Sequence, residues 1–87
     1  MKVKISVYAT LREKLQWKTK EVNLNKNRVD LLDVFNELPD LKKYVIENGK
    51  IREGFMILIN GINIKFLSDL KIKDGDEIDI FPPGGGG

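Results

Sequence analysis

The sequence predicts an α+β fold in which a mixed sheet of about five strands is crossed by one main helix. Three observations support this prediction. Residues 3–8 read VKISVY, where apolar and polar side chains alternate as they do in a half-buried strand. Residues 31–38 place apolar side chains at helical spacing. Residues 55–66 read FMILINGINIKF, two β-rich runs around an Asn-Gly pair.

The N-terminal strand is expected to bury every second residue, so that Tyr8 points away from the core. Its inward side chains are Val3, Ile5 and Val7. Residues 20–24, KEVNL, repeat the alternation weakly and predict a second strand. Between these strands, residues 9–19 are expected to form a polar loop. Its apolar residues are Leu11, Leu15 and Trp17. The last two are expected to pack back on the core and receive no functional role.

The main helix is expected to begin at Asp30, an N-cap residue, with Asp33 favouring the positive end of the helix dipole. Its apolar face consists of Leu31, Val34, Phe35 and Leu38. Pro39 is expected to end the helix, because the residue before a proline avoids helical backbone angles. Asp40 is then the expected cap of a second short helix, which ends at Asn48-Gly49. Its inward side chains are Leu41, Tyr44 and Val45.

The C-terminal half is expected to form strands and turns. Asn60-Gly61 predicts a type I′ hairpin turn, and residues 68–70 indicate a turn or a single helical turn. A turn at 74–76 precedes a last strand at 77–81, whose inward side chains are Ile78 and Ile80. Pro82-Pro83 ends this strand, because proline has no N–H. We expect the first and last strands to pair in parallel beneath the helix, an arrangement called a β-grasp.

The composition indicates one soluble domain and excludes several kinds of chemistry. The 87 residues are 41% hydrophobic and 32% charged, and a net charge of +2 is too small to favour a nucleic-acid partner. The absence of cysteine and histidine excludes disulfides, thiol nucleophiles, imidazole catalysis and Cys/His metal sites. The acidic stretch at 73–79 does not match a calcium loop and reads as a polar turn, so no metal is expected.

The sequence gives no sign of a membrane segment or of export. No stretch approaches the roughly 20 apolar residues of a membrane span. The N-terminus, MKVKISVYATLREK, alternates charged and apolar residues, whereas a signal peptide needs a continuous apolar stretch. The chain is therefore expected to be cytoplasmic.

The chain closes with FPPGGGG, which carries its one unusually presented reactive group. Residues 1–81 are expected to form the domain and residues 82–87 a flexible tail. Pro82 and Pro83 direct the tail away from the sheet. Its glycines, Gly84, Gly85, Gly86 and Gly87, form the narrowest polypeptide that can enter a slot in another protein. The carboxylate of Gly87 is unreactive until a partner activates it, for example as an acyl-adenylate. The alternative is a passive linker on a plain interaction domain.

The predicted strand alternation places two aromatic side chains beside this tail. Tyr8 and Phe81 point outward, and parallel pairing brings them together where the tail leaves. One of two alternating sets in the hairpin must also face outward: Met56 and Leu58, or Phe55, Ile57 and Ile59. The exposed sheet face is therefore expected to be apolar and to dock a partner. The alternative is that the aromatics only cover the sheet itself.

Several stretches resemble the family of the molybdopterin synthase small subunit, also called the sulfur-carrier subunit or MoaD. They are ATLRE after the first strand, ILINGINI in the hairpin and, most specifically, IKDGDEIDIFPP followed by glycines. The wider group of MoaD/ThiS/Urm1-like proteins includes thiamin sulfur carriers, tRNA-thiolation carriers and archaeal ubiquitin-like modifiers. The resemblance covers essentially the whole chain and implies a ubiquitin-like β-grasp fold. Arg12 and Glu13 match the family motif and are expected to form a local salt bridge.

The resemblance implies a sulfur carrier that binds no cofactor and is not catalytic on its own. A ubiquitin-activating-type enzyme, MoeB-like, uses ATP to adenylate Gly87, and sulfur then replaces the adenylate to give a thiocarboxylate. The tail enters a large MoaE-like catalytic subunit, which transfers the sulfur to the molybdopterin precursor in molybdenum cofactor biosynthesis. Gly86 and Gly87 are the functional pair in such families. Four glycines depart from the family pattern, and two other roles stay open: a ubiquitin-like protein modifier and a tRNA-thiolation carrier.

Overall fold

The structure, a computed structural model, describes residues 1–84. Within this range the helices are α1 (Ala9–Leu15), α2 (Leu31–Asn36), α3 (Pro39–Val45) and the 3₁₀ turn η1 (Ile64–Phe66). The longer strands are β1 (Lys2–Val7), β2 (Thr19–Asn23), β6 (Met56–Ile59) and β9 (Glu77–Phe81). The two-residue strands are β3 (Val29–Asp30), β4 (Ile46–Glu47), β5 (Lys50–Ile51), β7 (Ile62–Asn63) and β8 (Lys71–Ile72).

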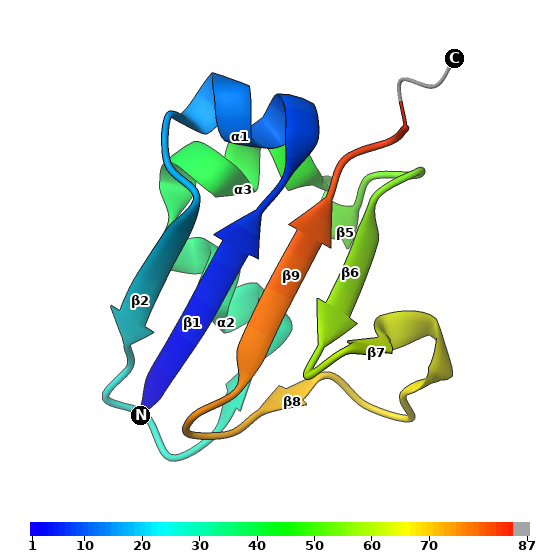
Figure 1. The fold of residues 1–87 in the computed structure, drawn as a ribbon. Coiled ribbons are helices and arrows are strands. Elements are labelled where there is room, and N and C mark those ends of the chain that lie inside the picture. The colour runs from blue at the N-terminus through cyan, green and yellow to red at the C-terminus, as the bar shows by residue number, and fades with distance from the viewer. Residues whose placement is uncertain (85–87) are drawn as a thin grey trace.

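The main sheet has five strands in the order β2-β1-β9-β6-β7, and the helices cover one of its faces (Figure 1). β1 and β9 lie in parallel at its centre, with Ile5 opposite Ile78 and Val7 opposite Ile80. The other neighbouring strands of this sheet are antiparallel. The predicted α+β class, the parallel pairing of the first and last strands and the β-grasp arrangement are therefore confirmed.

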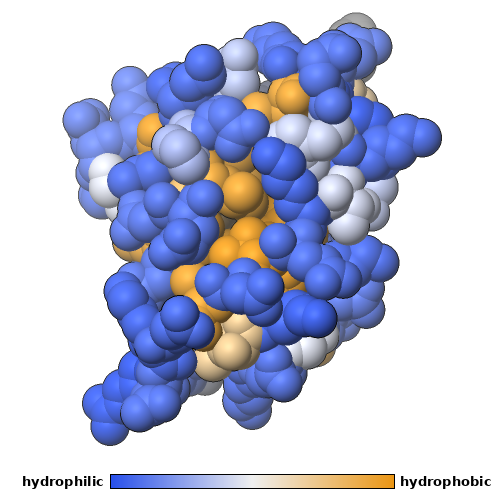
Figure 2. Space-filling model, turned by 90° about the vertical axis from the view of Figure 1, so that its left-hand side faces the viewer, coloured by the Kyte–Doolittle hydropathy of each residue, from blue (hydrophilic) through white to orange (hydrophobic). Residues whose placement is uncertain are grey.

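The core lies between the inner face of this sheet and the helices. All but one of the side chains predicted to point inward are buried: Val3, Ile5, Val7, Leu31, Val34, Phe35, Leu38, Leu41, Val45, Ile78 and Ile80. The partial exception among those expectations is Tyr44, which is only partly buried against the core. Full burial of one aliphatic side chain contributes roughly 1.5–3 kcal/mol, so this cluster is the main source of stability. Viewed from the side of β2, apolar atoms show only as a narrow band framed by hydrophilic residues (Figure 2).

The start of α2 is built as the sequence predicts. The carboxylate of Asp30 accepts a hydrogen bond from the Asp33 N–H at 3.1 Å, and the carboxylate of Asp33 accepts one from the Asp30 N–H at 3.0 Å. The bond from the Asp30 N–H, helped by the Lys26 ammonium 3.6 Å away, lowers the pKa of Asp33. This capping box satisfies backbone donors that a helix end otherwise leaves unpaired.

Residues 9–15 form α1, although a loop was expected over 9–19. The helix is held down by Leu11, which is 2% exposed, and by Leu15, which packs against the core one turn later. Trp17 also packs back on the core, as predicted. Among the described residues, no helix is long and apolar enough to cross a membrane.

Two expectations about caps are wrong. Asp40 does not cap α3, because Pro39 already occupies its first turn and the cap position falls on Leu38. Asn48-Gly49 is not a helix end: both residues have positive φ, +53° and +74°, and they turn the chain from β4 into β5. For residues 68–70, where a turn or a single helical turn was expected, the chain bends at Ser68, and the single helical turn lies earlier, at η1.

Candidate functional site

The tail leaves the domain at the end of β9, beside the end of β1. Because these strands are parallel and Val7 lies opposite Ile80, the residues that follow, Tyr8 and Phe81, come side by side. Their rings stack with centroids 4.3 Å apart and planes 9° from parallel. The predicted meeting of the two aromatics is therefore confirmed. They are half-buried, however, and not as exposed as the sequence suggested.

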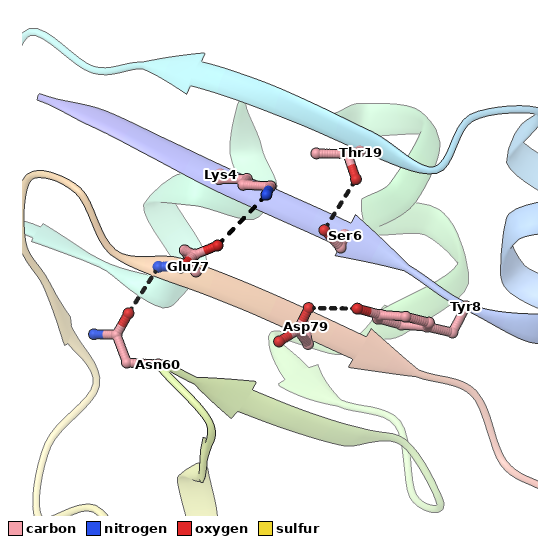
Figure 3. Close-up of polar contacts among 7 residues, drawn as sticks. All are labelled: Lys4, Ser6, Tyr8, Thr19, Asn60, Glu77 and Asp79. Carbon is pink, nitrogen blue, oxygen red and sulfur yellow. Dashed lines mark hydrogen bonds and ion pairs between the residues drawn. The ribbon is translucent and has the colours of Figure 1, made fainter.

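Tyr8 is held in place by two further contacts. Its hydroxyl donates a hydrogen bond to Asp79 on β9 at 2.8 Å (Figure 3). This bond to a carboxylate, together with burial, raises the pKa of Tyr8 above its usual value. The Arg12 guanidinium lies 5.2 Å from the centre of the same ring, and its Nε donates to the Val7 carbonyl at 3.1 Å. Arg12 thus orients an aromatic side chain.

The local salt bridge expected of Arg12 and Glu13 is not formed among residues 1–84. The two residues are adjacent on α1, where side chains one position apart do not face each other. The Arg12 side chain instead reaches back to the end of β1.

The outer sheet face is apolar only at the corner beside the tail. Met56 lies opposite Phe81 and Leu58 opposite Asp79 on the neighbouring strand, while Ile57 and Ile59 turn inward to the core. We call Tyr8, Met56, Leu58 and Phe81 the apolar corner. Met56 is its most open member, at 41% exposed.

The rest of the outer sheet face is polar. It carries the Lys4–Glu77 ion pair, the Ser6–Thr19 hydrogen bond and the bond from the Glu77 N–H to Asn60 (Figure 3). The expectation that the whole exposed face is apolar is therefore wrong. Alternation determines which residues face outward, but five of the six outward positions on β1 and β9 hold charged or hydroxyl side chains, and Phe81 is the exception.

The base of the tail rests against a turn that the sequence analysis missed. Gly54 has a φ of +92°, and a Cβ atom placed on it would lie 2.9 Å from Cγ of Pro83. Only glycine allows the backbone of this turn to approach the proline so closely. Beyond a charged stretch with one glycine, nothing in IREGF pointed to this contact, because residues 54 and 83 are far apart in the chain.

The predicted tail residues are only partly visible. Pro82 and Pro83 follow β9 without regular secondary structure, as the end of the strand requires, and Gly84 is exposed. Gly85, Gly86 and Gly87 lie outside the described residues, so their role stays a prediction. Within residues 1–84, no three acidic side chains gather in a way that could hold a metal ion.

Fold and tail base together define a ubiquitin-like β-grasp protein with a glycine-rich C-terminal segment. The model of the ThiS family matches residues 5–87. The chain therefore belongs to the ThiS family of small, ubiquitin-like sulfur-carrier proteins. A search of the curated proteins finds no match.

Three solved structures are similar over nearly their whole length. Small archaeal modifier protein 1 from Methanosarcina acetivorans is 35% identical, with 99% of this chain and 96% of that chain covered and a TM-score of 0.72. SAMP1 from Haloferax volcanii is 24% identical, with 100% of both chains covered and a TM-score of 0.82. A putative molybdopterin converting factor subunit 1 from Pyrococcus furiosus is 24% identical, with 97% and 99% covered and a TM-score of 0.68. At 24% identity, the last two support the fold alone.

Proposed function

We propose that this chain carries sulfur on Gly87, whose carboxyl group is adenylated and then converted to a thiocarboxylate. The observation that carries the proposal is the ThiS family match over residues 5–87, because it includes the domain and the glycine tail together. The tail base supports it. β9 is a central strand whose C-terminal end leads directly into Pro82, and the apolar corner beside it offers a partner a surface to bind.

The chemistry takes place in the partners' active sites. A carboxylate oxygen of Gly87 attacks the α-phosphorus of ATP on a ubiquitin-activating-type enzyme, and the bond to pyrophosphate breaks. A hydrosulfide-equivalent donor then attacks the acyl carbon, and AMP leaves with the electron pair of the broken C–O bond. The product is a thiocarboxylate, which can pass its sulfur to an acceptor. The carrier supplies the acyl group and its placement, and no side chain of the carrier takes part.

The glycines suit this role because they lack side chains. A partner that closes tightly around Gly84, Gly85 and Gly86 can hold the reacting carboxyl group and exclude water from it. The six residues from Pro82 to Gly87 reach at most about 20 Å from the domain at ~3.3–3.6 Å each. The apolar corner then anchors the domain at the mouth of the partner's slot.

For the acceptor, we propose the molybdopterin precursor, reached through a large MoaE-like catalytic subunit, because the DGDEIDIFPP stretch resembles that family most. A second candidate is a protein modifier or tRNA-thiolation carrier, in which the same activated carboxyl group serves a lysine or a tRNA-modifying enzyme. The 35% identity to small archaeal modifier protein 1 favours this second role. Both roles begin with the same adenylation.

Intact-mass measurement tests the shared first steps. The full chain is incubated with the cognate adenylating enzyme, ATP and sulfide, and we expect a mass gain equal to the replacement of one oxygen by sulfur. A chain lacking Gly87 should show no gain. Met56→Asp should slow the reaction by weakening docking at the apolar corner, whereas Leu32→Asp is the matched control. Leu32 is 39% exposed but lies on α2, away from the tail.

The outcomes separate the proposals. No mass gain on the full chain, with an enzyme shown to act on another carrier, would contradict the sulfur-carrier function and leave the passive linker. A gain that Met56→Asp and Leu32→Asp affect equally would contradict docking at the apolar corner only. Once the thiocarboxylate is established, mixing it with a MoaE-like subunit and the precursor, or with lysine-bearing proteins, distinguishes the two acceptors.

A further inference from the structure

A second surface borders the tail base, on the other side from the outer sheet face. A hollow of about 380 Å³ lies between α1, α3 and the turn that holds Pro83. Its polar wall consists of Thr10, Lys14, Lys43, Tyr44 and Arg52. Among residues 1–84, no carboxylate side chain lines it. We call this hollow the basic groove.

The two lysines of the groove converge on one aromatic ring. Nζ of Lys14 lies 5.5 Å from the centre of the Tyr44 ring, and Nζ of Lys43 lies 5.2 Å from it. Neither ammonium has a carboxylate within ion-pair distance in the part of the chain that the structure describes. Two like charges near one ring repel each other, and a bound anion would offset that repulsion.

The floor of the groove is apolar and is continuous with the tail. Leu11, Phe55, Pro82 and Pro83 line it, and Gly54 fixes Pro83 against the neighbouring turn. Pro82 and Pro83 belong both to this lining and to the base of the tail, so the groove adjoins the segment that a partner of the tail approaches. Arg52 adds a third cation, although Glu47 partly neutralises it at 3.5 Å.

We infer that the basic groove receives an acidic segment of the adenylating enzyme that activates the tail. The inference rests on the proposed function and adds a charged contact to the apolar one. An acidic side chain fits the unpaired lysines, and the apolar floor suits the carbon atoms of such a segment better than it suits a nucleic-acid backbone. The small net charge of +2 also argues against a nucleic-acid partner. Charge complementarity of this kind speeds encounter and fixes orientation.

Steady-state pyrophosphate exchange with the cognate adenylating enzyme tests this inference. The double variant Lys14→Glu/Lys43→Glu should raise the KM for the carrier by about tenfold or more at low salt, because steering contributes of order 10–10³ to association rates. Its kcat should not change, since neither lysine reaches the reacting atoms. The KM of the wild-type chain should rise with salt, and that of the variant should rise less.

The matched control is Lys71→Glu/Lys73→Glu, which changes the net charge by the same amount. These lysines lie on and just after β8, at the far end of β9 from the tail (Figure 1). We expect the control to keep the wild-type KM, and thermal unfolding checks that both variants fold.

Each outcome has a distinct meaning. If the groove variant and the control have the same KM, or if the groove variant binds more tightly, the inference is overturned while the sulfur-carrier function stands. If the wild-type chain is not adenylated at all, the proposed function itself fails, and the inference with it. Bulk tRNA provides a further test. If it inhibits the exchange with the wild-type chain but not with the groove variant, the groove binds RNA, and the assignment to an acidic protein segment is overturned.

Discussion

Gly54 lies close against Pro83 at the base of the tail. A Cβ atom there would lie 2.9 Å from Cγ of Pro83, whereas a Cβ on Gly49 would have nothing within 4 Å. Both glycines have positive φ, +92° and +74°. Substituting each by alanine therefore separates backbone strain, which both share, from the contact with the tail, which only Gly54 makes.

We expect Gly54→Ala to be more destabilising than Gly49→Ala. Left-handed backbone costs an L-residue roughly 1–2 kcal/mol at either position. Crowding against Pro83 should add about 1–3 kcal/mol to the cost at Gly54. Urea unfolding of the wild-type chain and the two variants measures the difference. Equal losses of stability would show that Pro83 moves aside without cost, and would contradict a fixed tail base.

Asp40 ties the segment after α1 to α3. The indole Nε1 of Trp17 donates a hydrogen bond to it at 3.0 Å, and the Lys20 ammonium lies 3.9 Å from the same oxygen. Burial on its own raises the pKa of Asp40, but the bonds from Trp17 and the Leu41 N–H, with the Lys20 charge, outweigh it. The pKa of the Asp40 carboxyl group in the folded protein is therefore lower than its usual value.

This lowered pKa predicts a pH dependence with a definite sign. Asp40 contributes stability that is fully present above its unfolded pKa of about 3.9 and is lost as the pH falls through its lower folded pKa. Asp40→Asn should thus be less stable than the wild-type chain at pH 7, and the difference in stability should be smaller at pH 2. Thermal unfolding measures this difference, and the fluorescence of Trp17, the single tryptophan, reports the local change.

Glu37→Gln provides the control for this experiment. The Glu37 side chain makes no ion pair among residues 1–84, and it is exposed at the end of α2. Its removal should therefore leave stability nearly unchanged at both pH values. A difference in stability between Asp40→Asn and wild type that is as large at pH 2 as at pH 7 would contradict a contribution from the ionised carboxylate.

Helices and strands with a repeating pattern of apolar residues were predictable from the sequence, whereas very short elements were not. β1, β9 and the buried face of α2 follow from alternation or helical spacing over several residues. α1 has only seven residues and one buried position, although Leu11 and Leu15 are spaced four apart, as on a helix. The Asn-Gly pair at 48–49 is the same dipeptide that correctly predicted the hairpin at 60–61. The strands on either side of the pair at 48–49, β4 and β5, have only two residues each, and β4 directly follows α3, so no alternation predicted them.

In the candidate site, too, some contacts were predictable from local sequence patterns and others were not. Strand alternation and parallel pairing were sufficient to place Tyr8 beside Phe81. The contacts of Gly54 and of the Lys14–Tyr44–Lys43 cluster depend on segments that meet only in the folded chain. No local pattern in a single sequence records such tertiary contacts, whereas strand periodicity is written into consecutive residues.

The molecule as a whole depends on its last strand. β9 lies between β1 and β6 at the centre of the sheet, so the core cannot close until the end of the domain is in place. Ile78 and Ile80, both 1% exposed, fill the middle of that core. Such long-range parallel pairing is slow to form, because the chain must close a loop of nearly its whole length first.

Two truncations test where the domain ends, which the sequence predicts to be residue 81. A chain that stops after Phe81 retains the whole main sheet and loses Pro82 and Pro83, including the contact of Pro83 with Gly54. If that contact is worth about 1 kcal/mol, its melting temperature should fall by roughly 4–8 °C. A chain that stops after Asp76 lacks β9 and should not fold, because β1 and β6 lose their shared neighbour. Circular dichroism during heating distinguishes the outcomes. If the 1–81 chain is unfolded, Pro82 and Pro83 belong to the folded domain. If the 1–76 chain melts cooperatively, the central role of β9 is contradicted.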